Sequence, residues 1–182
     1  MKNCIELIKA CPYITMDEYA YMKSLAAKMP SAQRVVMIGA GPGELLLSFL
    51  EGYRYPSAKC TVIDKGTCEY VEAHVLGDEA IDDQYSLSIE YVVNYSQVVA
   101  RDWFEKIDLL IVDGDHTYEG VRADIQSWAK YVRKYIWFHD FDGKAIGQED
   151  YPDSRKLIEA YAVLAKWSLL STPGCSAVYS VT

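Results

Sequence analysis

One short polar segment of the chain carries the residue types that could do chemistry. The apolar run of residues 107–112 ends in Asp113, and Asp115 and His116 follow at once, before a helix-like sequence begins. Carboxylates and imidazoles exchange protons, and they are costly to bury unless they pair or bind something. Ligands of open α/β sheets bind at the carboxyl ends of strands. We therefore interpret residues 113–124 as a site rather than as scaffold.

A glycine turn earlier in the chain is the second candidate. Glycines stand at positions 39, 41 and 43, between a β-branched run and a helix-like sequence, and they let the backbone approach a ligand closely. The dinucleotide fingerprint needs its third glycine where this chain has Glu44. That carboxylate would repel a pyrophosphate, so the spacing suits a ligand without phosphates, such as S-adenosylmethionine. A purely structural strand-to-helix turn is the alternative.

Asp64 strengthens the ligand interpretation of this turn. It ends the next apolar run, about twenty residues after the glycines, where an acid can bind both hydroxyls of a ribose. A helix N-cap or a solvated loop acid is the alternative for this residue.

The surrounding pattern predicts the elements that must position these groups. Thr15 and Glu18 form a capping-box pattern at the start of a helix over residues 14–29. Apolar positions at helical spacing (Val121, Ile125, Trp128 and Val132) predict another helix after the polar segment. The remaining expected elements are strands at 34–38, 59–64, 88–93, 107–112 and 135–138, a helix at about 154–165, and a hairpin over 167–182.

Strands that alternate with helices indicate an α/β fold. We expect a Rossmann-like, seven-stranded, mostly parallel sheet with helices on both faces and a C-terminal antiparallel hairpin. Residues 1–182 should form one domain, with residues 1–30 as an N-terminal helical segment packed on the core.

The composition excludes several classes of protein. Hydrophobic residues make up 51% of the chain, yet no apolar run approaches the length of a membrane span. A net charge of −8 disfavours nucleic-acid partners. The five cysteines are an odd number without a Cys-x-x-Cys pair, which favours free thiols in a reducing compartment. We therefore expect a cytoplasmic protein.

The motifs together resemble a known family. The glycine turn with Ile38, the run that ends in Asp64 and the segment from Val112 to Asp124 look like a class I S-adenosylmethionine-dependent methyltransferase. The sequence Asp-Gly-Asp-His-Thr-Tyr-Glu-Gly-Val from residue 113, followed by Trp128 and by Phe-His-Asp at 138–140, is similar to the macrocin-type small-molecule O-methyltransferases. The resemblance covers roughly residues 34 to 142.

The resemblance implies methyl transfer to a hydroxyl of a small-molecule acceptor and a role for each matching residue. The cofactor would contact Gly39, Ala40, Gly41 and Gly43 beside its methionine part, Asp64 at its ribose, Ser96 near its adenine, and Asp113 near its methyl group, and Lys65 is a further cofactor-binding candidate. Asp113, His139 and Asp140 match the metal ligands of the magnesium-dependent members, and His116 matches a proposed general base.

Three positions depart from the family pattern. Met37 stands where such enzymes often carry an acid, Tyr95 replaces the aspartate of a Gly-Asp-Ser pattern, and His139 replaces an acidic metal ligand. Because magnesium prefers oxygen ligands, the metal site could be altered. The alternatives at these two positions are a structural role for His139, and helix capping or hydrogen bonding within the turn for His116.

Two other functions remain open at this point. One is a nicotinamide- or flavin-binding oxidoreductase, which Glu44 disfavours; the other is a degenerate domain that binds the cofactor without catalysis. The loops at residues 1–13 and 142–153 should decide the acceptor. A homodimer is expected, because so small a core would borrow pocket walls from a second subunit.

Overall fold

The computed structural model describes residues 13–30, 33–41, 43–53, 58–66, 88–142 and 152–181, together with Ile5 and Lys9. Most of residues 1–12 and of the expected acceptor loop at 142–153 therefore lies outside the described residues. The helices are α2 (Met16–Lys28), α3 (Glu44–Gly52), α6 (Ser96–Val99), α7 (Tyr118–Trp128) with the 3₁₀ turn η2 (Ala129–Tyr131), and α8 (Pro152–Ala165). The strands are β1 (Arg34–Ile38), β2 (Lys59–Asp64), β3 (Ser88–Val93), β4 (Ile107–Val112), β5 (Val132–Phe138), β6 (Ser168–Ser171) and β7 (Ala177–Ser180).

All seven strands form one sheet in the order β3-β2-β1-β4-β5-β7-β6. The first five run parallel, while β7 pairs antiparallel with both β5 and β6. The predicted fold class, with its C-terminal hairpin, is confirmed. One boundary was wrong: Val132 opens β5 instead of continuing α7, because η2 ends the helix first.

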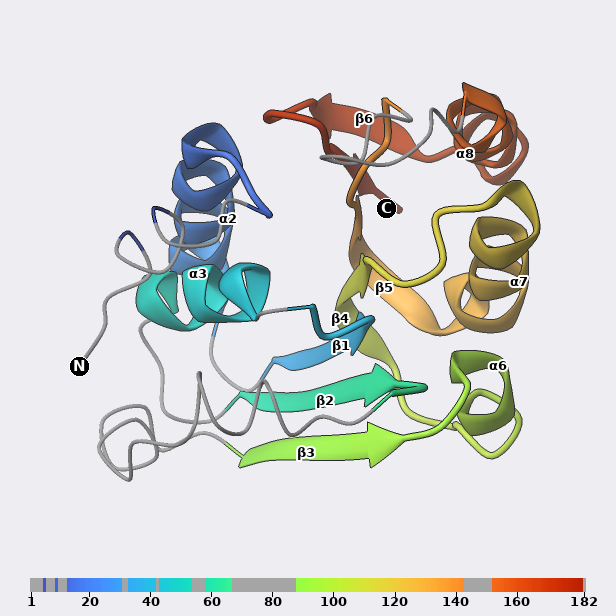
Figure 1. The fold of residues 1–182 in the computed structure, drawn as a ribbon, viewed down its shortest axis with the longest axis horizontal. Helices are drawn as coiled ribbons and strands as arrows, with labels where there is room; N and C mark the ends of the chain where they lie inside the picture. The colour runs from blue at the N-terminus through green and yellow to red at the C-terminus, as the bar shows by residue number, and fades with distance from the viewer. Residues whose placement is uncertain are drawn as a thin grey trace.

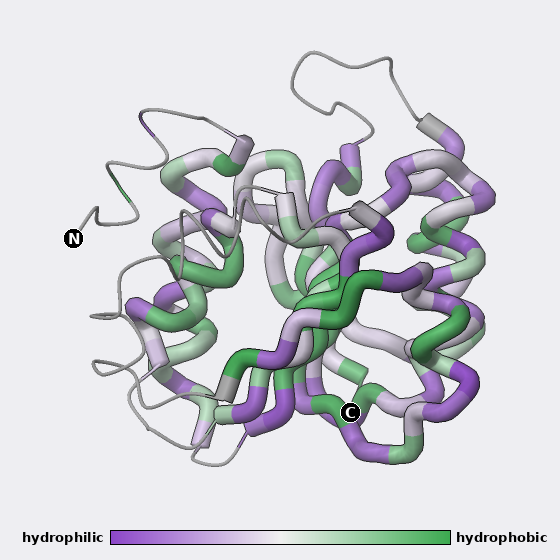
Figure 2. Tube along the Cα trace, turned by 60° about the horizontal axis from the view of Figure 1, so that its bottom comes forward, coloured by the Kyte–Doolittle hydropathy of each residue, from purple (hydrophilic) through white to green (hydrophobic). Residues whose placement is uncertain are grey.

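The sheet carries helices on both faces, as Figure 1 shows. Alternate residues of the strands point to opposite sides. Val35, Met37 and Cys60 belong to the cluster under α2 and α3, whereas Val36 and Ile38 belong to the cluster under α7 and α8. The hydropathy view shows the same core, with hydrophobic positions concentrated along the central strands (Figure 2). Trp128 is fully buried in the second cluster, as its helical spacing indicated.

The predicted capping box starts α2. Thr15 accepts a hydrogen bond from the Glu18 amide through its hydroxyl oxygen, and the Glu18 carboxylate accepts one from the Thr15 amide at 2.7 Å. Two amides that the helix itself cannot satisfy are thereby paired. The cap also fixes Glu18, whose side chain is fully buried, in one orientation.

The parallel register brings the candidate residues to one edge of the sheet. Ile38 pairs with Ile63 and with Val112, and Val112 pairs with Phe138. The residues that follow these strands are therefore neighbours, although they are distant in sequence. None of the described helices is both long and apolar enough to cross a bilayer.

Candidate functional site

The glycine turn is fitted against the start of the β4 loop. Gly39 has a φ of +83°, and a Cβ at this position would overlap the backbone carbonyl of Asp113. Gly41 also has a positive φ, +47°, but a Cβ there would meet no atom within 4 Å. The first glycine therefore allows close packing of backbone on backbone, and the second faces open space.

Asp64 is held by the turn that it faces. Its Oδ2 accepts a hydrogen bond from the Ala40 amide at 2.8 Å, and its Oδ1 accepts one from the Gly66 amide at 2.7 Å. These bonds fix the carboxylate at the end of β2. The bond to the Ala40 amide ties Asp64 to the glycine turn, while the residues after Gly66, where a helix capped by Asp64 would lie, are outside the described residues.

A pocket of about 660 Å³ opens at this edge of the sheet, a volume within the usual range for small-molecule sites. Of the predicted cofactor residues, it is lined by Gly39, Gly41, Asp64, Lys65, Ser96 and Asp113. Ala40 and Gly43 lie outside the lining. Ala40 is buried and supports Asp64, while Gly43 is the left-handed N-cap of α3 with a φ of +92°.

Asp124 forms a polar floor under this pocket. Although Asp124 stands in the first turns of α7, it is only 2% exposed. Its Oδ1 accepts hydrogen bonds from the Ser96 hydroxyl and, at 2.8 Å, from the Gln97 side-chain amide. Burial raises the pKa of Asp124 to about 6, against the lowering effect of both hydrogen bonds.

Glu44 was expected to face the phosphates of a bound dinucleotide, but its side chain does not point into the pocket. It is buried at the start of α3 and does not line the pocket. Burial raises its pKa to about 7, and the charge of Asp113 adds to that rise. Repulsion by an exposed carboxylate is therefore no argument against a pyrophosphate here.

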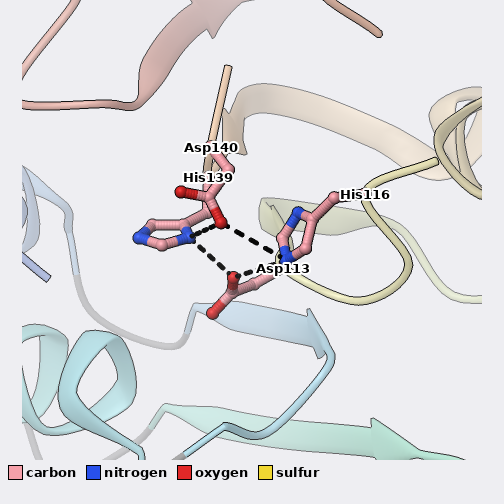
Figure 3. A group of neighbouring side chains, drawn as sticks. All are labelled: Asp113, His116, His139 and Asp140. Carbon is pink, nitrogen blue, oxygen red and sulfur yellow. Dashed lines mark ion pairs between the residues drawn. The ribbon is translucent and has the colours of Figure 1, made fainter. Parts of the chain in front are cut away.

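The predicted base and the predicted metal ligands converge beside the pocket (Figure 3). His139 Nδ1 lies 2.9 Å from Asp113 Oδ1 and 3.2 Å from Asp140 Oδ2. His116 Nε2 lies 3.4 Å from Asp140 Oδ2 and 4.0 Å from Asp113 Oδ1. One donor atom from each of the four residues falls within 4.8 Å of the others, a spacing that could hold a metal ion. We call these four residues the Asp–His cluster.

His116 is not the cap of α7. Thr117 takes that position and accepts a hydrogen bond from the Gly120 amide, while Asp115 accepts one from the Thr117 amide. The backbone carbonyl of His116 is fixed by the Ser154 hydroxyl of α8 at 2.8 Å. The imidazole is thereby left to point into the cluster.

His139 lies between two sets of acids. Nδ1 faces the cluster, and Nε2 lies 3.4 Å from Glu18 Oε1. Burial lowers the pKa of His139, but the charge of Asp113 and contacts with Asp113, Asp140 and Cys175 outweigh it and raise the pKa well above its ordinary value. Nδ1 is nevertheless without a hydrogen-bond partner of acceptable geometry among the described residues.

Asp140 is held in an unusual backbone conformation. Its φ is +49°, a left-handed value that few residues other than glycine adopt and that tends to occur at functional sites. Burial raises the pKa of the Asp140 carboxyl, but the lowering effect of His139 and His116 is larger, so the pKa lies below its ordinary value. The geometry therefore supplies a fixed negative charge opposite both histidines.

Sequence reasoning missed the support behind His139. Glu18 was assigned only its local role in the helix cap, and nothing in the capping pattern indicates a long-range contact. Its Oε1 also accepts hydrogen bonds from the Ser176 hydroxyl and from the Cys175 thiol at 3.2 Å. Cys175 and Cys60 are free thiols, as expected; the other three cysteines lie outside the described residues.

Known proteins share this architecture. A methyltransferase from Geobacter sulfurreducens has a TM-score of 0.69 at 16% identity, over 97% of this chain and 83% of that one. The O-methyltransferase from Bacillus cereus, solved with S-adenosylhomocysteine (SAH), has a TM-score of 0.64 at 11% identity, over 97% and 87%. The MycE methyltransferase of the mycinamycin biosynthetic pathway, solved with Mg and SAH, has a TM-score of 0.63 at 15% identity, over 97% of this chain and 54% of that one.

The family model described as a methyltransferase domain matches residues 36–141, from β1 to just beyond the Asp–His cluster. The matched residues include the glycine turn, Asp64 and the whole cluster, which are the features that carried the resemblance in sequence. More than half of the chain is covered, and the protein therefore belongs to this methyltransferase family, with the fold of the class I S-adenosylmethionine-dependent enzymes.

Proposed function

We propose that the protein transfers a methyl group from S-adenosylmethionine to a hydroxyl of a small-molecule acceptor. The observation that carries this proposal is the position of Asp113. Asp113 lines the same pocket as the glycine turn and Asp64, and it also belongs to the Asp–His cluster. The methyl end of a cofactor bound along this pocket would thus lie beside carboxylate and imidazole groups that can accept a proton.

The pocket lining suggests how the cofactor is bound. Asp64, held by two backbone amides, would accept hydrogen bonds from both ribose hydroxyls, with Lys65 beside it. Ser96 would lie at the adenine, and since its hydroxyl already donates to Asp124, its oxygen remains able to accept. The methionine part would pass Gly39 and Gly41, with Ala40 and Gly43 shaping the turn.

The reaction requires an acceptor oxygen that is deprotonated and aligned with the methyl group. The sulfonium of S-adenosylmethionine supplies the electrophilic methyl when bound. His116 would take the acceptor's proton, since imidazole is the side chain that most often serves as a general base. Asp140, 3.4 Å from His116 Nε2, would orient the ring and favour its charged form after the transfer.

Magnesium, expected from the family resemblance, does not fit the donor set well. Magnesium takes near-octahedral oxygen ligands, whereas the donor that stands between the two carboxylates is the imidazole nitrogen of His139. We therefore assign no step of the reaction to magnesium.

We keep a small-molecule acceptor, a cytoplasmic location and a homodimer as parts of the proposal.

Isothermal calorimetry with SAH tests the proposal. We expect one SAH per chain and a 10- to 100-fold loss of affinity, roughly, in Asp64→Asn, because a charge-assisted hydrogen bond contributes about 1.5–3 kcal/mol. Asp102→Asn, at an exposed acid that does not line the pocket, is the control and should bind like the wild type.

Tighter binding of NAD⁺ or FAD than of SAH would favour an oxidoreductase instead. Binding of SAH without turnover on phenolic, sugar and polyketide acceptors would favour a degenerate domain.

A further inference from the structure

We propose that Asp113, His139 and Asp140 bind a divalent ion of the late first transition series, such as Zn²⁺, in preference to Mg²⁺. The site is that of the proposed function, but ion binding is measured without cofactor or acceptor. The two proposals can therefore fail separately.

The distances from His139 Nδ1 to the two aspartate oxygens suit a small divalent ion. Donor atoms at about 2.0–2.2 Å from one ion lie roughly 3.0–3.5 Å from each other. His139 Nδ1 is 2.9 Å from Asp113 Oδ1 and 3.2 Å from Asp140 Oδ2, so the side chains already stand at about the separations that coordination requires. The three residues come from the ends of β4 and β5, two paired strands, which makes the set rigid.

The second, independent observation is the state of the His139 ring. Its side chain is 7% exposed, and Nδ1 points into the cluster without hydrogen-bonding geometry toward any described acceptor. The Asp113 and Asp140 carboxylates form ion pairs with the ring, but neither is the hydrogen-bond partner of good geometry that nearly all buried polar atoms have. A metal ion bound through the Nδ1 lone pair would be that partner.

Glu18 would be the positioning residue for this histidine. A histidine that binds a metal through one nitrogen usually donates its other N–H to a carboxylate. Glu18 Oε1 lies 3.4 Å from Nε2, and the capping box and Ser176 hold it there. In Figure 3 the ring turns one nitrogen toward Asp113 and Asp140 and the other away from them. When the ion is bound in place of the Nδ1 proton, the pair would thus fix the tautomer that donates Nε2–H to Glu18 and presents the Nδ1 lone pair to the ion.

The donor types decide between ions. One imidazole nitrogen with two carboxylate oxygens resembles the mixed sets that catalytic zinc sites use, with room left for a water or substrate oxygen. Imidazole favours zinc, iron and copper, whereas carboxylates and water suit magnesium and manganese. His116 stands at the edge of this set, 4.0 Å from Asp113 Oδ1, and keeps its assigned role as the base.

Titration of the chelator-treated protein with Co²⁺, Zn²⁺ and Mg²⁺ tests the proposal. Cobalt reports its ligands through its visible absorption, and calorimetry measures the other two ions. We expect one equivalent of Co²⁺ and of Zn²⁺, with Zn²⁺ binding on the order of a hundredfold more tightly than Mg²⁺. Equal affinity for Mg²⁺ and Zn²⁺, or no binding in a one-to-one ratio, would overturn the proposal.

Variants locate the ion and distinguish the two proposals. Asp113→Asn should abolish the cobalt spectrum, and Glu18→Gln should weaken binding about 10- to 100-fold. His139→Asp should shift the preference toward Mg²⁺. His116→Gln should keep the ion while losing turnover, so loss of the spectrum in that variant contradicts the assignment.

Cys175 provides a further control, because Glu18, His139 and Cys175 form a second group that could hold an ion. Its Glu18 oxygen already accepts from Ser176 and from the Cys175 thiol, which leaves that group satisfied. Cys175→Ser should therefore leave the cobalt spectrum unchanged. A thiolate-to-cobalt charge-transfer band in the wild type, lost in this variant, would place the ion in the second group and refute the proposed site.

Discussion

Glu18 Oε1 lies 3.4 Å from Nε2 of His139, so the N-terminal cap of α2 reaches the centre of the Asp–His cluster. The same carboxylate accepts hydrogen bonds from the amide and the hydroxyl of Thr15 through its other oxygen, at 2.7 and 2.9 Å. A short local motif therefore does two things: it starts a helix, and it fixes a histidine that follows the fifth strand.

The cap can be tested apart from the cluster. Thr15→Ala should lower the free energy of unfolding by about 1 kcal/mol, because the amide of Glu18 loses its acceptor. Urea denaturation measures this change. Thr15→Ser keeps the hydroxyl and should lose far less, whereas equal losses in both variants would mean that the cap hydrogen bond is not responsible.

The glycine turn offers a matched pair of variants. Gly39→Ala should destabilise the protein by about 2–3 kcal/mol or more, since its φ is positive and its Cβ would overlap the Asp113 carbonyl. Gly41→Ala should destabilise the protein by only about 1 kcal/mol, because its positive φ is unfavourable for alanine but open space surrounds the added Cβ. Denaturant midpoints should separate the two clearly; similar midpoints would contradict the close approach of Gly39 to Asp113.

Asp108 anchors the end of the sheet opposite the site. The carboxylate is fully buried and accepts hydrogen bonds from Arg133 at 2.8 and 3.0 Å and from the Arg34 amide at 3.0 Å. Asp108→Ala should lower the unfolding free energy by about 2–3 kcal/mol, since these donors lose a charged partner. Glu159→Ala, which breaks an exposed pair with Arg155, should change it by less than about 1 kcal/mol. Comparable losses would contradict the role of burial.

Asp124 should make stability depend on pH. Its pKa is about 6 in the folded protein and about 3.9 in an unfolded chain, so folding favours the protonated form. This contribution is complete below the unfolded pKa and is lost as pH rises through about 6. Asp124→Asn cannot ionise, so its stability relative to the wild type should rise by about 1 kcal/mol between pH 5 and pH 8. Thermal unfolding at several pH values measures this difference, and a constant offset would show that Asp124 does not titrate in this range.

The fold could be predicted closely from sequence because its signals are local. β-Branched runs, the capping box at Thr15 and the Pro-Gly turn at 173–174 each depend on neighbouring residues. The one misplaced boundary, at Val132, arose because its spacing continued the apolar face of α7. Spacing alone cannot show that a 3₁₀ turn ends the helix before that residue.

The site could be predicted only in part. The positions of Asp64, Asp113 and His116 follow from the rule that ligands bind at strand ends. The burial of Asp124 could not be read from sequence, because it depends on Ser96 and Gln97 of another helix closing over it. The contact of Glu18 with His139 likewise exists only once α2 packs beside the C-terminal hairpin, where a Cβ on Gly174 would overlap Thr15.

A crystal structure of the protein grown with millimolar SAH tests the central claim most directly. We expect SAH in the pocket of about 660 Å³, with both ribose hydroxyls on the Asp64 carboxylate, the adenine beside Ser96 and the sulfur facing Asp113. SAH bound elsewhere, or a pocket that stays empty of SAH at that concentration, would contradict the proposal that this methyltransferase domain uses S-adenosylmethionine at this site.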